Sequence, residues 1–147
     1  MKISKYQPQM YPKIRELLKN DDKDPRTGLA WDMELFRPEV SKFYTKFVAI
    51  ETNKVVGVIV MSMRLYTAEI NFVYVHQEYR GKGIAQKLAK ATEQSARAQH
   101  AEGITINCGQ ENESAQKFNR KIGLKEVGRV KNYFSNNNTQ IFYWKKL

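Results

Sequence analysis

Hydrophobic residues follow two different periods along the chain, and short polar stretches separate the segments. Apolar positions recur at helical spacing over residues 10–19, 30–44, 83–99 and 112–121. β-Branched or alternating runs predict strands over residues 2–6, 46–51, 55–63, 67–75 and 104–108, with two more strands within 129–147. Strands followed by alternating helices and strands predict an α/β fold around one mixed sheet.

Several residues mark the expected ends and faces of these elements. Thr52-Asn53-Lys54 predicts a short turn between two strands, and Pro38 predicts an interruption of the helix over 30–44. Asn112 is expected to cap the N-terminus of a helix, and Gly123 is expected to end it. The residues expected to share a strand face are Ile70, Phe72 and Tyr74, and those expected to share a helix side are Ile84, Leu88, Ala91 and Ser95.

Length and composition fit one domain spanning residues 1–147. The chain has 41% hydrophobic residues, enough to build a core, and a formal net charge of +10. Such a charge is typical of proteins that bind nucleic acid, an anionic membrane or a phosphorylated ligand. Most of it, +7, lies in residues 117–147, where the solvated faces of a helix and strands are the simplest explanation.

Cysteine and histidine are too scarce for a disulfide framework or a metal centre. The single cysteine, Cys108, is expected to be a small buried residue, and His76 and His100 are expected at the surface or in turns. The first residues lack the apolar core of a signal peptide. No stretch approaches the ~20 apolar residues of a membrane span, so we expect a cytoplasmic protein that does not enter a membrane.

The segment 79–85, Tyr-Arg-Gly-Lys-Gly-Ile-Ala, joins a strand to a helix with two glycines and two cations. A helix N-terminus leaves backbone N–H groups unpaired, and glycines let a diphosphate approach them closely. Neither the Gly-Lys-Ser/Thr pattern of ATP-binding loops nor the three-glycine dinucleotide pattern is present. The segment therefore predicts an anion site of another kind, or a tight turn with solvated Arg80 and Lys82.

Three linked segments resemble the GNAT superfamily of N-acetyltransferases. Arg80-x-x-Gly83-x-Ala85 is similar to the family signature Gln/Arg-x-x-Gly-x-Gly/Ala. The strand before it resembles the family's fourth strand, and residues 112–124 resemble its Asn-x-x-Ala-x-x-Phe-Tyr-x-x-x-Gly-Phe segment. The resemblance covers roughly residues 48–128. It implies one GNAT-like domain with a mixed, mostly antiparallel sheet, flanked by helices, whose central strands splay apart.

The resemblance also implies that acetyl-CoA is the co-substrate and that no metal takes part. Main-chain groups of the strand before the turn would pair with the pantetheine arm, and the turn would enclose the diphosphate. Asn112 would meet the cofactor's arm, cap its helix, or do both. The residues implied as cofactor-binding are Val73, Tyr74, Val75, Arg80, Gly81, Lys82, Gly83, Ile84, Ala85, Gln86 and Asn112.

Acetyl transfer to an amine requires a base for the amine and a proton for the departing thiolate. By resemblance to histone-type members, Glu69 is the candidate base, and an exposed or salt-bridged carboxylate is the alternative. Asn119 stands where the family has a proton-donating tyrosine, so it can only orient a water or hydrogen-bond the thiolate. Tyr133 and Tyr143 are weak substitutes, because aromatic strand residues are more often core.

Together these residues predict an N-acetyltransferase that moves an acetyl group from acetyl-CoA to a primary amine of a small molecule, peptide or protein by direct attack. An acyl-CoA-binding protein with little catalysis and a basic nucleic-acid-binding module are the alternatives, and the absence of known nucleic-acid-binding motifs disfavours the second.

The subtype and the acceptor are less defined by the sequence. Some N-terminal acetyltransferases have a glutamate on the fifth strand, and Asn107 stands at the matching position here, which disfavours that subtype. Family habit makes a homodimer plausible. The acidic residues that would attract a cationic acceptor, or form a solvated loop, are Asp21, Asp22, Asp24, Asp32 and Glu34.

Overall fold

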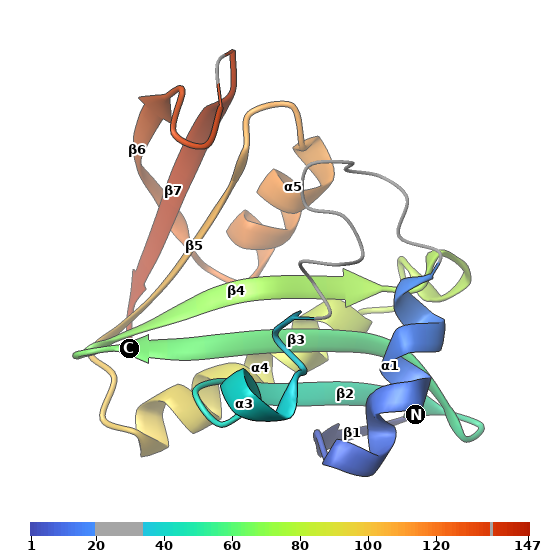
Figure 1. Cartoon of the computed structure of the whole chain (residues 1–147). Coiled ribbons are helices and arrows are strands. Elements are labelled where there is room, and N and C mark those ends of the chain that lie inside the picture. The colour runs from blue at the N-terminus through green and yellow to red at the C-terminus, as the bar shows by residue number, and fades with distance from the viewer. Residues whose placement is uncertain (20–33, 136) are drawn as a thin grey trace. The chain divides into compact units, whose positions relative to one another are not determined.

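The computed structural model describes residues 1–19, 34–135 and 137–147. Within these ranges the chain forms two compact units. Unit 1 comprises residues 1–62 and 71–92, and unit 2 comprises residues 63–70 and 93–147. Figure 1 shows the elements, coloured from the N-terminus to the C-terminus.

Unit 1 contains the N-terminal strands and helices. Its strands are β1 (Lys2–Lys5), β2 (Thr45–Glu51), most of β3 (Lys54–Arg64) and the second half of β4 (Thr67–Val75). Its helices are α1 (Tyr11–Leu18), α3 (Pro38–Ser41) and the first part of α4 (Ile84–Ala98), with the 3-10 turns η1 (Pro8–Met10) and η2 (Gln77–Tyr79). The β2–β3 turn is confirmed at Thr52 and Asn53, which both have positive φ.

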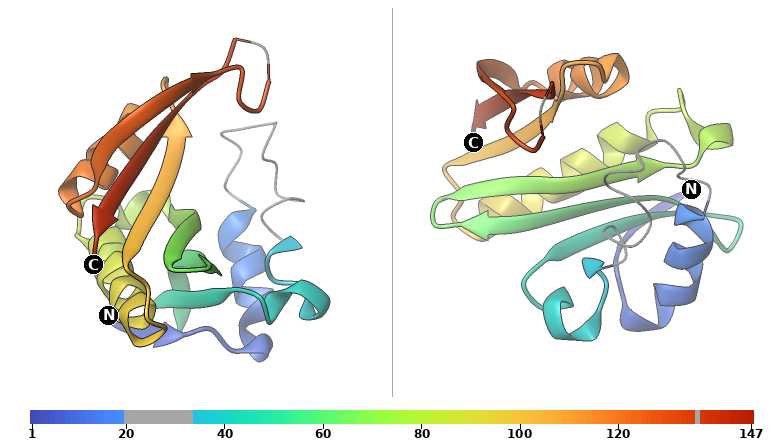
Figure 2. Two further views of the ribbon diagram at one scale, coloured as in Figure 1. Left: turned by 90° about the vertical axis from the view of Figure 1, so that its left-hand side faces the viewer. Right: turned by 45° about the horizontal axis from the view of Figure 1, so that its top comes forward.

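The core of unit 1 lies on both faces of β2 and β3. One face packs against α1, in a cluster whose members include Ile14, Leu17, Leu18, Val48, Val58, Val60 and Tyr74. On the other face, a Cβ built on Gly57 would lie 3.2 Å from side-chain carbons of Ile84 and Leu88, so α4 approaches the strand closely. Because residues 57 and 58 point to opposite sides of a strand, α1 and α4 cover opposite faces (Figures 1 and 2).

Unit 2 contains the C-terminal strands and helix α5 (Glu113–Lys121). Its strands are the first half of β4, β5 (Gly103–Gly109), β6 (Lys125–Lys131) and β7 (Thr139–Lys146). Alternate residues of β5 and β7 are buried, namely Ile104, Ile106, Cys108, Ile141 and Tyr143. Asn119 of α5 is fully buried and donates a hydrogen bond to Cys108 Sγ at 3.6 Å, so this buried face is the one that α5 covers.

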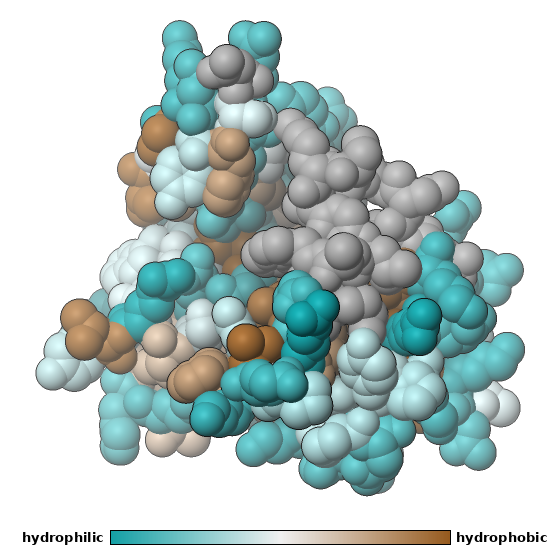
Figure 3. Space-filling view, viewed as in Figure 1, coloured by the Kyte–Doolittle hydropathy of each residue, from teal (hydrophilic) through white to brown (hydrophobic). Residues whose placement is uncertain are grey.

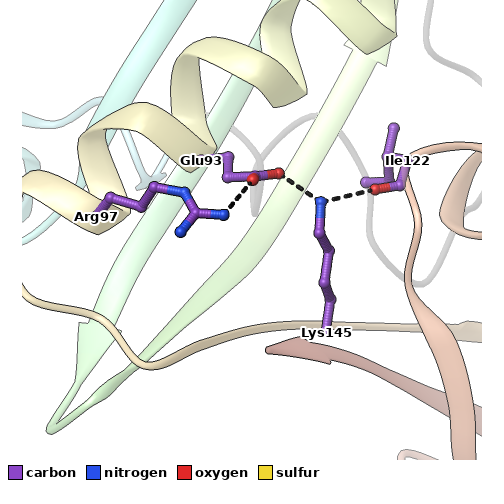
Figure 4. A network of polar contacts seen from close by, with 4 residues as sticks. All are labelled: Glu93, Arg97, Ile122 and Lys145. Atoms are coloured by element: carbon purple, nitrogen blue, oxygen red, sulfur yellow. Dashed lines mark hydrogen bonds and ion pairs between the residues drawn. The ribbon is translucent and has the colours of Figure 1, made fainter. Parts of the chain in front are cut away.

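A polar network joins three elements of unit 2 (Figure 4). Lys145 Nζ of β7 lies 2.7 Å from Glu93 Oε2 of α4 and 3.4 Å from the carbonyl oxygen of Ile122, which follows α5. Arg97 Nη2 donates to Glu93 Oε1 at 2.9 Å. Burial opposes the charge of Glu93, but the hydrogen bonds from Lys145 and Arg97 outweigh it and lower the pKa of Glu93. One cation of the basic C-terminal segment therefore has a structural role.

The strand order in the seven-stranded sheet is β1-β2-β3-β4-β5-β7-β6. β4 and β5 pair in parallel, whereas the pairs β1–β2, β2–β3, β5–β7 and β6–β7 are antiparallel. The expected α/β fold with a mixed, mostly antiparallel sheet is therefore confirmed.

Two details of the sequence prediction are wrong. Pro38 begins α3 instead of interrupting a helix, because the first helical position needs no N–H donor. β6 begins at Lys125, before the expected start of the tail strands at residue 129. In the continuous helix α4, Ile84, Leu88, Ala91 and Ser95 share one side, as expected, although Ala91 and Ser95 are only partly buried. The buried residues of α4 are Ile84, Leu88, Ala89, Thr92 and Ala96.

Some expectations fall on residues 20–33, outside the described ranges. They concern Trp31 in the helix over 30–44 and the acidic residues Asp21, Asp22, Asp24 and Asp32. Among the described helices, none combines the length and the apolar character needed to cross a membrane.

Candidate active site

The turn between β4 and α4 has the backbone that an anion site needs. Gly81 and Gly83 have φ values of +76° and +75°, in the left-handed region that residues with a side chain rarely adopt. A Cβ built on Gly81 would meet no atom within 4 Å, so the space beside this glycine is open. His76 Nδ1 accepts the N–H of Glu78 and fixes the start of the turn. The local sequence thus produces an open, glycine-shaped turn.

Helix α4 begins directly after Gly83 and directs its N-terminus at this turn. The N–H of Lys87 donates to the carbonyl of Gly83 at 3.1 Å. The N–H groups of Ile84, Ala85 and Gln86 precede this bond and have no acceptor within the helix. Together with the positive end of the helix dipole, they suit a phosphate group. The turn therefore fits the diphosphate of a nucleotide cofactor.

Of the two cations of the turn, Arg80 contacts the end of β4 and Lys82 contacts the turn itself. Arg80 Nε donates to the carbonyl of Val75 at 2.8 Å, and its guanidinium lies 5.5 Å from the ring centroid of Tyr74. Lys82 Nζ lies 5.2 Å from the ring centroid of Tyr79. Arg80 thus ties the turn to the end of β4 and uses the Val75 carbonyl that the family resemblance assigns to the pantetheine arm.

The end of β4 supplies the strand that the resemblance assigns to the cofactor. β4 pairs with β5 through Thr67, Ala68 and Glu69, and the described pairing stops there. Residues 71–75 are the last strand of unit 1 in the order of the sheet. Phe72 and Tyr74 stack at 6.5 Å and pack on the α1 face, which confirms that they share a face. Main-chain groups of the outer strand of a unit are suited to pair with an extended ligand.

Glu69, the candidate base, lies on the part of β4 that belongs to unit 2. Its side chain is 23% exposed, and it forms a salt bridge with Arg64 at the end of β3. In register it lies opposite Thr105 of β5. Glu69 is therefore salt-bridged, and its carboxylate is held in place by a residue that sequence reasoning did not single out. The sequence signal for Arg64 is its position just before the tight turn that leads to Glu69.

Helix α5 holds two asparagines with different surroundings. Asn112 is exposed, and its Oδ1 accepts the N–H of Ala115 at 3.0 Å, which confirms the predicted helix cap. Asn119 is fully buried, and its Oδ1 has no hydrogen-bond partner among the described residues. Cys108, its contact on β5, is buried as expected, and burial raises the pKa of its thiol.

The two candidate tyrosines of the C-terminal segment differ in access. Tyr143 is fully buried, and burial raises the pKa of its hydroxyl, so it is a core residue. Tyr133 is 50% exposed in the turn between β6 and β7 and packs edge-to-face on Phe142 and Phe134. Of the two, only Tyr133 can meet a ligand from solvent.

The chain matches the model of the acetyltransferase (GNAT) family over residues 9–124. The chain belongs to the GNAT acetyltransferase family. It is therefore an N-acetyltransferase, an acyltransferase, as the sequence predicts, and neither the binding-protein nor the nucleic-acid alternative is supported. The fit of the glycine turn to a diphosphate agrees with this assignment.

Relatives of the chain are acetyltransferases as well. It is 25% identical over 140 residues to an N-alpha-acetyltransferase 30 from Schizosaccharomyces pombe, covering 91% of this chain and 90% of the relative. The ribosomal-protein-S18-alanine N-acetyltransferase from Escherichia coli has a TM-score of 0.82 at 15% identity, covering 99% and 92% of the two chains. An aminoglycoside 6'-N-acetyltransferase solved with coenzyme A has a TM-score of 0.76 at 17% identity, covering 99% and 97%. These solved structures share the fold of this GNAT chain.

Proposed function

We propose that residues 1–147 act as one acetyltransferase domain that uses acetyl-CoA and acetylates a primary amine. The observation that carries this proposal is the turn at Gly81 and Gly83, where an open backbone meets three N–H groups of α4 that have no acceptor within the helix. A GNAT structure of the same fold was solved with coenzyme A. The proposed cofactor-binding residues are Val73, Tyr74, Val75, Arg80, Gly81, Lys82, Gly83, Ile84, Ala85, Gln86 and Asn112.

Acetyl-CoA would supply an activated acetyl group to this site. Glu69 would accept a proton from the amine, directly or through water, as the nitrogen–carbon bond forms and the carbon–sulfur bond breaks. Arg64 would hold the carboxylate of Glu69 in place until the acceptor arrives. The amide of Asn119, which now donates to Cys108, would offer a hydrogen bond to the departing thiolate, and Tyr133 or water would supply its proton.

The acceptor and the setting of the reaction are also part of the proposal. The relatives include enzymes named for protein N-termini and for an aminoglycoside, so both peptide N-termini and small amines are acceptor classes for this chain. Asn107 on β5 replaces the strand glutamate of some N-terminal acetyltransferases. This replacement does not exclude N-terminal acetylation, since an N-alpha-acetyltransferase is among the relatives. We further propose a cytoplasmic enzyme that needs no metal, membrane or nucleic acid and that is able to form a homodimer.

The decisive experiment is acetyl-CoA-dependent release of thiol against a panel of amines. Wild-type protein should release thiol only with acetyl-CoA and an amine present. Glu69→Gln should lower kcat/KM by roughly 100-fold or more while leaving the Kd for acetyl-CoA nearly unchanged, because a general base contributes about 10²–10⁴ to the rate. Equal turnover in the variant would refute Glu69 as the base, and no turnover with any amine would refute the proposed reaction.

A further inference from the structure

Trp144 on β7 is an exposed indole held in a defined place on unit 2. Its side chain is 40% exposed. A Cβ built on Gly103 of β5 would lie 2.5 Å from Nε1 of the indole and 2.7 Å from two of its carbons. Any residue with a side chain at position 103 would therefore displace the ring. The glycine lets the indole lie directly over the β5 backbone.

The strand register brings this indole close to Glu69. Glu69 lies opposite Thr105 in the β4–β5 pair, and Thr105 lies opposite Trp144 in the β5–β7 pair. Residues opposite one another in adjacent strands point to the same side of a sheet, so all three share one face. At roughly 4.8 Å between strands, the Cα atoms of Glu69 and Trp144 are about 10 Å apart. A small amine held at Glu69 would reach the indole with its neighbouring groups.

The same face of β7 also carries a separate aromatic cluster, on the side of Trp144 away from Gly103. Phe142, two residues before Trp144, points to the same side, and Tyr133 packs against it at 5.1 Å between ring centroids. Phe134 contacts Tyr133 at 4.7 Å and is 69% exposed. Figure 3 shows apolar side chains among hydrophilic ones over β6 and β7. Both the exposed indole and this aromatic cluster would pack well against an apolar group.

The charges near the indole indicate whether the acceptor carries an apolar group or a second cationic group beside its amine. Lys125 of β6 lies opposite Trp144, and Arg64 forms the ion pair with Glu69. Because the charge of Arg64 is balanced by Glu69, a second cation on the acceptor would face the positive charge of Lys125, whereas a neutral ring would not. An exposed indole with a cation beside it therefore favours a neutral aromatic or large apolar group.

We propose that Trp144 determines acceptor specificity, and that the acceptor is an amine carrying an aromatic or large apolar group next to the nitrogen. The inference rests on the proposed function, because Glu69 marks where the amine reacts. The indole of Trp144 binds the apolar group, and Glu69 takes the amine proton. Trp144 would contact the substrate and take no part in proton transfer.

Kinetics with matched amino acid amides test this assignment. Phenylalaninamide should be acetylated with a kcat/KM about tenfold higher than alaninamide and lysinamide, chiefly through a lower KM, because an aromatic contact adds to the burial of the ring. Trp144→Ala should remove this preference and leave the KM values for alaninamide and acetyl-CoA unchanged. Trp144→Phe should retain part of it. Phe43→Ala, at a 67% exposed phenylalanine of unit 1, is the matched control and should change nothing.

A binding measurement separates failure of this proposal from failure of the proposed reaction. Trp31→Phe leaves Trp144 as the only tryptophan. Phenylalaninamide should then saturably shift the indole emission to shorter wavelength, and alaninamide at the same concentrations should not, whether or not any amine is acetylated. Absence of a saturable shift would overturn the proposal. The proposal would also be overturned if Trp144→Ala kept the preference for phenylalaninamide over alaninamide. The same holds if this variant dissociated a dimer without changing the selectivity.

Discussion

Asn119 shows what the replacement of one residue does to a catalytic position. In the family resemblance a tyrosine hydroxyl at this place reaches the cofactor's sulfur, whereas Asn119 is fully buried and contacts Cys108. An asparagine side chain has no titratable proton near neutral pH. Its amide can hydrogen-bond a thiolate but cannot protonate it, so the proton must come from Tyr133, from water, or from no enzyme group.

Lys46 on β2 is an ionisable residue that sequence reasoning passed over. Its side chain is only 3% exposed, and its Nζ donates to the carbonyl and hydroxyl oxygens of Ser41. The rings of Tyr6, Phe36 and Tyr44 surround it at 5.3, 5.6 and 5.9 Å. No carboxylate pairs with it among the described residues. Burial therefore lowers the pKa of Lys46 to about 8.

This lowered pKa predicts a pH-dependent stability. The unfolded chain keeps the ordinary lysine pKa of 10.5, so between pH 8 and pH 10.5 it binds more protons than the folded chain. The free energy of unfolding should therefore rise with pH through this window, by up to about 3 kcal/mol at 1.36 kcal/mol per unit of pKa. Urea unfolding at pH 7, 8, 9 and 10 measures it. In Lys46→Met this rise should disappear, and parallel pH curves for the two proteins would contradict the prediction.

At the scale of elements, the glycine turn and helix α4 together form one structural unit, the candidate anion site. The turn fixes where the helix begins, and the helix supplies the N–H groups that the turn exposes. Sequence reasoning predicted this piece well, because glycines, a helix start and strand periodicity are all local signals. It failed at Pro38, where the same local signal fits both the interruption of a long helix and the first residue of a short one.

Substitution of Gly83 tests the turn as a cofactor site. Gly83→Ala places a side chain at a φ of +75°, which costs roughly 1 kcal/mol of stability. Its Cβ would meet only the side chain of Gln86 at 3.5 Å, so the protein should still fold. We expect the Kd for acetyl-CoA, measured by calorimetry, to rise about tenfold or more, because the altered backbone misplaces the N–H groups that hold phosphate.

The matched control for this substitution is Gly128→Ala on β6. A Cβ at this position meets no atom within 4 Å, and its φ lies outside the left-handed region. Both the stability and the Kd for acetyl-CoA should stay close to wild type. If Gly83→Ala bound acetyl-CoA as tightly as Gly128→Ala does, the turn would not be the cofactor site.

At the scale of the whole molecule, the net charge of +10 no longer points to nucleic acid. Of the cations in residues 117–147, Lys145 pairs with Glu93 and Arg129 pairs with Glu126. The others are exposed, namely Lys117, Arg120, Lys121, Lys125, Lys131 and Lys146. These residues include a helix face and strand ends, as the charge pattern predicts for solvated surfaces. The family match accounts for the function without them.

Thermal unfolding with added ligand tests whether the protein binds acetyl-CoA or nucleic acid. Acetyl-CoA at 100 times its Kd should add about 2.7 kcal/mol of stability and raise the Tm by about 5–10 °C. An oligonucleotide of the same concentration should give a smaller shift that vanishes when salt rises from 50 to 200 mM, because phosphate contacts with lysine and arginine depend on released counterions. A salt-resistant shift with the oligonucleotide alone would reverse the assignment.

The sequence by itself determined the fold class, most element positions, the glycine turn and the family. Each of these depends on neighbours in the chain: periodicity, caps, turn residues and motif spacing. Only the tertiary structure decided which groups meet: Arg64 with Glu69, Asn119 with Cys108, Trp144 over Gly103, and Lys46 among aromatic rings. Strand register and burial create these contacts, and both arise when residues far apart in the sequence pack together, so no local pattern encodes them.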